Sequence, residues 1–264
     1  MLVFAGISPH PPLLIPEIGK ENLKFVRKTT EALNKLAEEL YASQPETIII
    51  ISPHGPMMAD AFVFNLSPHF EINFQDFGDL VTKIELAGDV GLTHHYKEIL
   101  ETKIPVVLTS QEKLDHGTGV PLYFLTKNLD SKKIKIVPGT FSMLDFNTHY
   151  QFGMKLQEDI LNDTKRIAVI ASGDMSHRLT PEAPAGYSHW AKKFDETLTK
   201  KIKEKDIKGI LKLDPEFIEE AGECGLRSFI ILHGILNSIN YTPEILSYEG
   251  PFGVGYLVAN FRLA

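Results

Sequence analysis

Histidines follow the most apolar runs of this sequence. His10 and His54 each end a Ser-Pro-His tripeptide, after the apolar runs 2–8 and 47–52, and His177 follows a third such run. Imidazole nitrogen binds Fe(II), Zn(II), Cu(II) and Ni(II). The proline before each of the first two histidines stiffens the backbone there. The repeated placement therefore indicates ligands for a metal ion.

Three acids could supply an oxygen ligand beside these histidines. Glu223 opens an apolar helical pattern, where the helix dipole favours an acid but burial is costly unless the carboxylate is paired or binds a metal. Asp174 and Glu249 are the alternatives, and Glu249, just before a Gly-Pro pair, is more typical of a turn. Two histidines and one carboxylate with open positions form the pattern of non-haem Fe(II) oxygenases. The residues alone leave the choice of acid open.

Other residues near these motifs have two interpretations. His116 is followed by the glycines at 117 and 119, just before an expected helix. A glycine lets the backbone approach a ligand, and a helix N-terminus favours an anion. His116 could equally be a hydrogen-bonded loop residue. Arg227 could pair with Glu223 four residues earlier, and Cys224 is a type more often found as a small core residue. The other histidines are interpreted as ordinary surface or core residues.

Short β-branched runs alternate with helical patterns along the chain, which predicts an α/β fold. We expect a three-layer αβα sandwich around a central, mostly parallel, mixed sheet, in a single domain over residues 1–264. Ligands bind beyond the carboxyl ends of the strands in such sheets, so the three histidines can converge there. The expected strands are 2–8, 47–52, 61–66, 82–86, 105–108, 134–138, 166–171, 245–248 and 253–262, and the expected helices are 22–41, 92–102, 121–128, 148–161, 190–204, one from 215 and 224–239.

The composition limits the class of protein. The chain has 264 residues, of which 43% are apolar and 23% charged, as in a globular protein with a real core. Its net charge of -7 argues against a nucleic-acid partner, and its single cysteine excludes an internal disulfide. No apolar run reaches the length that spans a bilayer. We therefore expect a cytoplasmic protein without a membrane partner.

Five ordered segments resemble the class III, LigB-type extradiol ring-cleavage dioxygenases, and the resemblance covers nearly the whole chain. The similarity is greatest to the LigB-like domain at the N-terminus of the fused AmmeMemoRadiSam system proteins, and the Memo proteins are more distant relatives. These segments are Ser8–Pro12, Ser52–Gly55, Asp115–Gly117, Ser172–His177 and Glu223–Ser228.

The resemblance implies a site and a reaction. His10, His54 and Glu223 match the metal ligands, with Fe(II) as the expected ion and Zn(II) or Cu(II) as alternatives. His177 matches the acid/base histidine, and His116 matches a histidine that assists proton transfer or dioxygen. The implied substrates are a catechol-type aromatic and dioxygen.

Further expectations accompany that resemblance. Asp174 and Arg227 are expected to bind substrate, and a homo-oligomer is expected because many soluble proteins of this kind form one. One alternative is a Memo-like regulatory protein that binds metal and a partner equivalent to the second domain of the fused relatives. Memo relatives carry a histidine/cysteine site, and Cys224 lies near that position. A zinc hydrolase with the same ligands is a further alternative.

Overall fold

A single ten-stranded sheet forms the centre of the protein, whose computed structural model describes all 264 residues. Its middle contains four parallel strands in the order β7-β2-β8-β1. Continuous β-branched and apolar runs form these strands, as expected where both faces of a sheet are covered. They are β1 (Leu2–Ser8), β2 (Thr47–Ser52), β7 (Lys135–Thr140) and β8 (Ile167–Ser172).

Antiparallel pairs extend this parallel centre at both edges, so the sheet is mixed. Beyond β1 lie β10 (Tyr256–Leu263) and then β9 (Tyr241–Glu249). Beyond β7 lie β5 (Asp79–Gly88) and β4 (His69–Phe74), which pair with each other antiparallel. Two short strands lie off this path: β3 (Phe62–Asn65) pairs with β7, and β6 (Val106–Thr109) pairs with β3.

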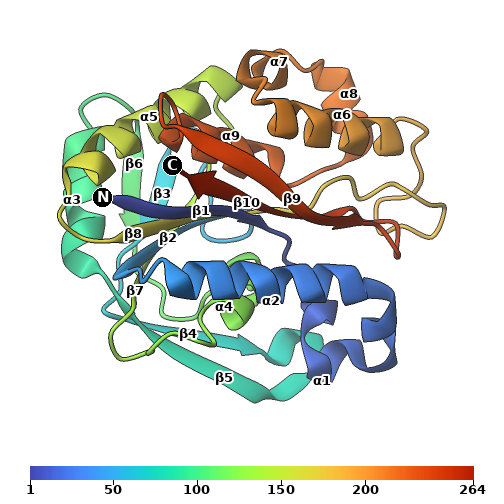
Figure 1. Ribbon diagram of the computed structural model, residues 1–264, viewed down its shortest axis with the longest axis horizontal. Coiled ribbons are helices and arrows are strands. Elements are labelled where there is room, and N and C mark those ends of the chain that lie inside the picture. Colours follow the sequence, from blue (N-terminus) through green and yellow to red (C-terminus); the bar gives the residue numbers. More distant parts are fainter.

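Helices cover both faces of the sheet (Figure 1), which confirms the predicted three-layer αβα sandwich. On one face lie α2 (Arg27–Ala42) and α4 (His116–Leu125), together with the short α1 (Pro16–Gly19). The other face carries α3 (Val90–Leu100), α5 (Phe146–Asn162), α6 (Ala191–Glu204), α7 (Ile207–Leu211), α8 (Pro215–Ala221) and α9 (Leu226–Ile235).

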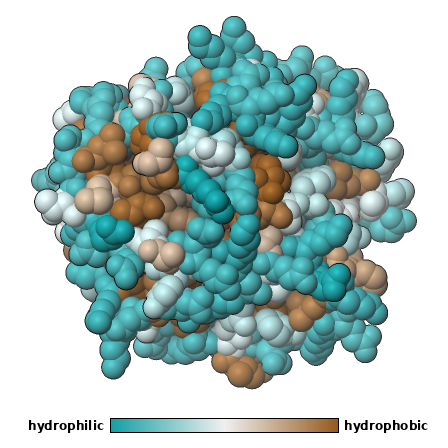
Figure 2. Space-filling model, in the orientation of Figure 1, coloured by the Kyte–Doolittle hydropathy of each residue, from teal (hydrophilic) through white to brown (hydrophobic).

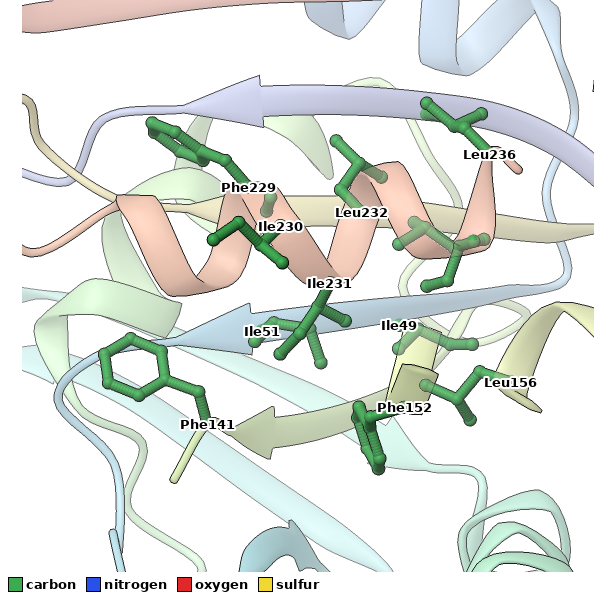
Figure 3. Packing of buried hydrophobic residues seen from close by; sticks show 14 of the residues in the cluster. Ile49, Ile51, Phe141, Phe152, Leu156, Phe229, Ile230, Ile231, Leu232 and Leu236 are labelled. Atoms are coloured by element: carbon green, nitrogen blue, oxygen red, sulfur yellow. The ribbon is translucent and has the colours of Figure 1, made fainter. Parts of the chain in front are cut away.

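The alternation of side chains along β2 creates the two cores. Ile49 and Ile51 pack into the cluster under α5 and α9 (Figure 3), whereas Ile48 and Ile50 pack into the cluster under α2 and α4. Successive side chains of a strand point to opposite faces, so one apolar run contributes to both cores. Full burial of each isoleucine contributes about 1.5–3 kcal/mol.

The surface is mainly hydrophilic in the face drawn in Figure 2, with apolar residues gathered in separate patches. Such patches are normal, because more than half of the surface of a folded protein comes from apolar atoms. None of the helices is both long enough and apolar enough to cross a membrane.

Two helix starts and one strand differ from the predictions in ways that affect the site. The helix expected from Pro121 begins at His116, so Pro121 lies inside α4. The helix expected from Cys224 begins at Leu226, which leaves Glu223 and Cys224 in the preceding loop. Strand β4 was not predicted, because its sequence mixes polar and apolar residues without a long β-branched run.

Candidate metal centre

The predicted histidines follow neighbouring strands. β2, β8 and β1 are adjacent and parallel, so they end at the same edge of the sheet. His10 follows β1, His54 follows β2, and the segment Gly173–His177 follows β8. Side chains that are far apart in sequence therefore gather at one place beyond the strand ends.

His10 and His54 face each other across this edge. Their Nε2 atoms lie 3.0 Å apart, and their rings are nearly perpendicular. His10 is buried, whereas His54 is exposed to solvent. Two ring nitrogens at this separation can share a cation as ligands or share one proton as a hydrogen bond.

The tautomer of His10 is fixed by its neighbours. Its Nδ1 lies 3.0 Å from Ser172 Oγ, and the Ser172 hydroxyl donates to Gly117 O at 2.5 Å. Because that hydroxyl proton is used, Ser172 accepts from His10 Nδ1–H, and the His10 Nε2 carries the lone pair. Pro121 lacks the N–H that would bond Gly117 O within α4, so this carbonyl is free for Ser172.

His116 completes one group of donors. Its ring stacks on that of His54 with centroids 4.3 Å apart, and the candidate ligand atoms of His10, His54 and His116 all lie within 4.8 Å of one another. Asp115 caps α4, and its Oδ1 accepts from Ser52 Oγ at 2.6 Å. The cap thereby joins the start of α4 to the end of β2, and it positions His116 beside His54.

A second group shares His10 with Asp174 and Cys224. The His10 Nε2 lies 3.7 Å from Asp174 Oδ2 and 3.6 Å from Cys224 Sγ. The Asp174 carboxylate also accepts from the backbone N–H of His10 at 3.0 Å. His177 Nε2 lies 3.7 Å from Cys224 Sγ and 4.0 Å from Asp174 Oδ2. This group offers nitrogen, oxygen and sulfur donors.

Glu223, the predicted carboxylate ligand, belongs to neither group. Its Oε2 accepts from Leu226 N at 2.5 Å, so the carboxylate binds the N-terminal turn of α9, where the helix dipole favours a negative charge. Arg227 donates to Leu144 O at 2.9 Å, and its guanidinium lies over the ring of Phe146. Glu249 accepts from the N–H and hydroxyl of Thr29, at the start of α2.

Backbone contacts hold the segment that carries Asp174 and His177. Met175 N donates to Gly255 O, and Gly255 N donates to Ser176 O, which ties the segment to the residue just before β10. Gly173 packs so closely on Gly225 that an added Cβ would lie 2.1 Å from the Gly225 Cα. This approach brings the loop of Cys224 against the end of β8.

Burial controls the charge of the site. Burial and the neighbouring histidines hold the pKa of His10 well below its usual value, and burial likewise lowers the pKa of His177. Burial raises the pKa of Asp174 to about 7. The imidazoles are thus neutral lone-pair donors, which is the form that binds a metal. Neutral imidazoles beside a carboxyl and a thiol suit a divalent transition metal ion.

An open cavity of about 440 Å³ adjoins the histidines. Its lining includes His54 and His116, together with Phe77, Gln111 and Lys113. The Phe77 ring meets the His116 ring edge-on, with centroids 5.1 Å apart. The cavity gives a small organic molecule access to the rings of His54 and His116.

Sequence reasoning missed Ser172, Ser52 and Asp115 as parts of the site. Ser172 orients His10, and Ser52 joins Asp115 to the end of β2. The cap could be predicted in part, because an Asp three residues before Thr118 is typical of an N-cap. In the structure, the Thr118 N–H donates to the Asp115 carboxylate. The contacts of Ser172 depend on the strand order and left no local signal.

Comparison with known proteins gives several curated relatives. Protein CA_C1420 of Clostridium acetobutylicum is 36% identical over 95% of this chain, which spans 55% of that protein's length. The 3,4-dihydroxyphenylacetate 2,3-dioxygenase of Escherichia coli is 21% identical, over 92% of both chains. The 2-aminophenol 1,6-dioxygenase beta subunit of a Pseudomonas species is 23% identical, over 99% of this chain and 94% of that one.

A solved structure shares the fold. The crystal structure of the uncharacterized protein JW3007 from Escherichia coli K12 matches with a TM-score of 0.70 and 18% identity, over 98% of this chain and 99% of that one. The family described as the catalytic LigB subunit of aromatic ring-opening dioxygenase matches residues 5–259. This chain, with its histidines gathered beyond adjacent parallel strands, belongs to the LigB family.

Proposed function

We propose that the protein is an extradiol-type dioxygenase that uses Fe(II) to open the ring of a catechol-type substrate. The observation that carries the proposal is the facing pair of His10 and His54, 3.0 Å apart at Nε2, beside an open cavity. Two histidines plus one carboxylate with open positions suit non-haem iron. The two dioxygenases among the relatives support the same reaction class.

His10, His54 and Glu223 would hold the ion. Glu223 lies in the loop before α9, next to Cys224, whose thiol reaches His10. When bound, the metal lowers the pKa of a catechol hydroxyl and brings both reactants together. Ser172 keeps the His10 lone pair directed at the ion, through the hydrogen bond at Nδ1.

His177 and His116 would move protons. The His177 ring lies beside Asp174 and Cys224, with a pKa lowered by burial, so it is ready to accept a proton from a substrate hydroxyl. His116 lines the cavity next to His54, where it would assist proton transfer or dioxygen. Asp174 accepts from the backbone N–H of His10 and would contact the substrate. Arg227, in the first turn of α9, would also contact the substrate.

Anaerobic loading with Fe(II), followed by dioxygen uptake with a panel of catechols, tests the proposal. We expect stoichiometric uptake and a coloured ring-opened product for at least one catechol. His177→Asn should lower kcat by about 100-fold or more, because general acid–base catalysis contributes that much. His94→Asn, at an exposed residue of α3, is the matched control and should leave uptake unchanged. An absence of uptake across the panel, with iron bound, would contradict ring cleavage.

A second candidate is a Memo-like metal-binding protein that acts with a partner and does not cleave rings. The position of Cys224, 3.6 Å from His10 Nε2, favours it, because thiolate sulfur suits Zn(II) and Cu(I) better than an oxygenase iron. The partner would be equivalent to the second domain of fused AmmeMemoRadiSam proteins. Tight metal binding without turnover, together with specific capture of that domain, would support it.

Three further properties are open to measurement: the bound metal, the oligomeric state and the cellular location. Metal analysis of protein purified without added metal shows whether it holds iron or zinc. Zinc, together with measured hydrolase activity, would favour the zinc hydrolase over the iron dioxygenase. Sedimentation at several concentrations tests the predicted homo-oligomer, and fractionation of cells tests the predicted cytoplasmic location.

A further inference from the structure

The cavity beside His54 and His116 has a wall that the metal chemistry leaves unexplained. Gln111, Lys113 and Asp76 line it together with the ring of Phe77. Few of the lining residues are apolar, although a catechol ring alone would need mainly apolar contacts. The polar groups on this wall therefore call for a polar substituent on the ligand.

The segment Gln111–Lys113 is held in an extended form from both sides. On one side, Asn65 of β3 bonds the backbone of Gln111 twice, once as donor and once as acceptor, each at 2.8 Å. On the other side, the backbone of Glu71 in β4 makes two hydrogen bonds: its C=O accepts from Leu114 N, and its N–H donates to Glu112 O, which forms a parallel bridge opposite Lys113. The backbone that carries the two side chains is thus fixed before any ligand binds.

An extended backbone directs alternate side chains to opposite sides. Gln111 and Lys113 accordingly line the cavity beside the histidines, whereas Glu112 between them lines a separate depression with Glu71 and Glu85. Two donor side chains are delivered to the site, and the one acid of the segment is turned away from it. This sorting of charge gives the wall a preference for an acceptor.

The existing partner of Lys113 is weakly bound. Its Nζ lies 2.8 Å from Asp76 Oδ2, but the side chains are 50% and 74% exposed. Exposed ion pairs contribute only about 0–1 kcal/mol, and the ammonium has two further N–H donors. Lys113 can therefore donate to a ligand without losing a strong contact.

We infer that Gln111 and Lys113 recognise a carboxylate on a side chain of the aromatic substrate, while the substrate ring lies in the cavity against Phe77 and beside the histidines. This inference rests on the proposed function and names the substrate class more closely. The Phe77 ring, edge-on to His116, supplies an apolar surface for the substrate ring. Lys113 supplies a charge-assisted hydrogen bond to the carboxylate.

The test compares three catechols that differ only at the end of a saturated chain on carbon 4, which carries 2-carboxyethyl, propyl or 2-aminoethyl. Their affinities for the Fe(II)-loaded protein are measured anaerobically by titration calorimetry. We expect the carboxylate compound to bind about tenfold more tightly than the propyl compound, the gain typical of a hydrogen bond to a charged group. Lys113→Met should bring the ratio of the two affinities close to one, and Lys113→Arg should keep most of the preference for the carboxylate compound. Asp76→Asn should increase it, because a competing acceptor is lost.

Two variants serve as matched controls. Lys83→Met removes the same charge from neighbouring β5, and Glu112→Gln changes the same segment on its other side; neither residue lines the cavity, so both should keep the wild-type ratio. Equal affinities for the three catechols, preference for the ammonium compound, or an equal loss in Lys83→Met would overturn this inference alone. Failure of all three catechols to bind the iron-loaded protein would overturn the proposed function and this inference with it.

Discussion

The Nδ1 atom of His10 lies 3.0 Å from the Oγ of Ser172, across two adjacent parallel strands. Ser172 in turn donates to Gly117 O at the start of α4. One serine thus joins the ends of β1 and β8 to the helix that carries His116. The contact also leaves the His10 Nε2 lone pair pointing at His54.

Removal of the Ser172 hydroxyl should weaken metal binding. In Ser172→Ala the His10 ring is free to change tautomer and to rotate, so we expect metal affinity to fall by about 10–100-fold. Competition with a chelator measures this change. Ser43→Ala, at the end of α2, is the control and should bind metal as the wild type does. Unchanged affinity in Ser172→Ala would show that packing alone orients His10.

The third metal ligand can be identified by two substitutions in one loop. Glu223→Gln keeps an oxygen that can accept from Leu226 N, but it removes the charge, so we expect metal affinity to fall by more than about tenfold. Cys224→Ser should keep a metal affinity within about twofold of that of the wild type, because the thiol is not one of the proposed ligands. Chelator competition gives both values.

The Co(II)-loaded protein gives an independent reading of the same ligand. Binding through His10, His54 and Glu223 should produce no charge-transfer absorption from sulfur. A thiolate band that disappears in Cys224→Ser would instead assign the thiol as the ligand and would favour the second candidate function. Comparison of the two variants excludes a general effect of the loop.

The contact between Gly173 and Gly225 should tolerate no side chain. An added Cβ on Gly173 would lie 2.1 Å from the Gly225 Cα, so Gly173→Ala should lower the free energy of unfolding by about 1–3 kcal/mol and should weaken metal binding as the loops separate. Gly91→Ala in α3, where an added Cβ has no neighbour closer than 4.0 Å, should raise stability by up to about 1 kcal/mol. Urea denaturation tests both, and a stable Gly173→Ala would contradict the close approach.

Acid should destabilise the protein partly through His233, which is buried in α9. Burial lowers its pKa from 6.5 to about 4. The unfolded chain therefore binds a proton that the folded chain does not, and stability that is complete above pH 6.5 is lost as the pH falls towards 4. The expected loss is about 3 kcal/mol.

Urea unfolding between pH 7 and pH 4 measures this dependence. His233→Phe removes the titrating group and keeps a ring against Phe261, so its stability should fall less steeply with acid. His94→Phe, at an exposed residue of α3, should keep the slope of the wild type. Equal slopes in all three proteins would exclude His233 as the source.

The central strands were predictable from local sequence. The predicted bounds of β1 and β2 match the structure, because strands buried on both faces need uninterrupted apolar and β-branched residues. The meeting of His10 and His54 followed from their equivalent places after these strands. The roles assigned to His10, His54, Glu223, His116 and His177 stay predictions.

The rest depended on contacts that a local pattern does not contain. Pro121 pointed to a helix start, yet α4 begins earlier, after its cap Asp115, and Ser172 donates to the Gly117 carbonyl that the proline leaves free. Glu223 and Cys224 lie in the loop before α9 and not in the expected helix, so helical periodicity could not predict that the Cys224 thiol faces His10 while the Glu223 carboxylate accepts from Leu226 N. The places of Gln111 and Lys113 in the cavity wall depend on the contact of their segment with β4, a strand that the sequence did not predict.

The attachment of the Ser176 segment to Gly255 has a consequence for the order in which the centre is assembled. A ribosome makes His10 and His54 early, but the loop with Asp174 and His177 gains its bonds to Gly255 only after nearly the whole chain has been synthesised. A growing chain therefore presents these two imidazoles before the loop of Asp174 and His177 is fixed beside them. Tight capture of a metal ion must wait for the late strands, so an ion that the protein retains reports a completed fold.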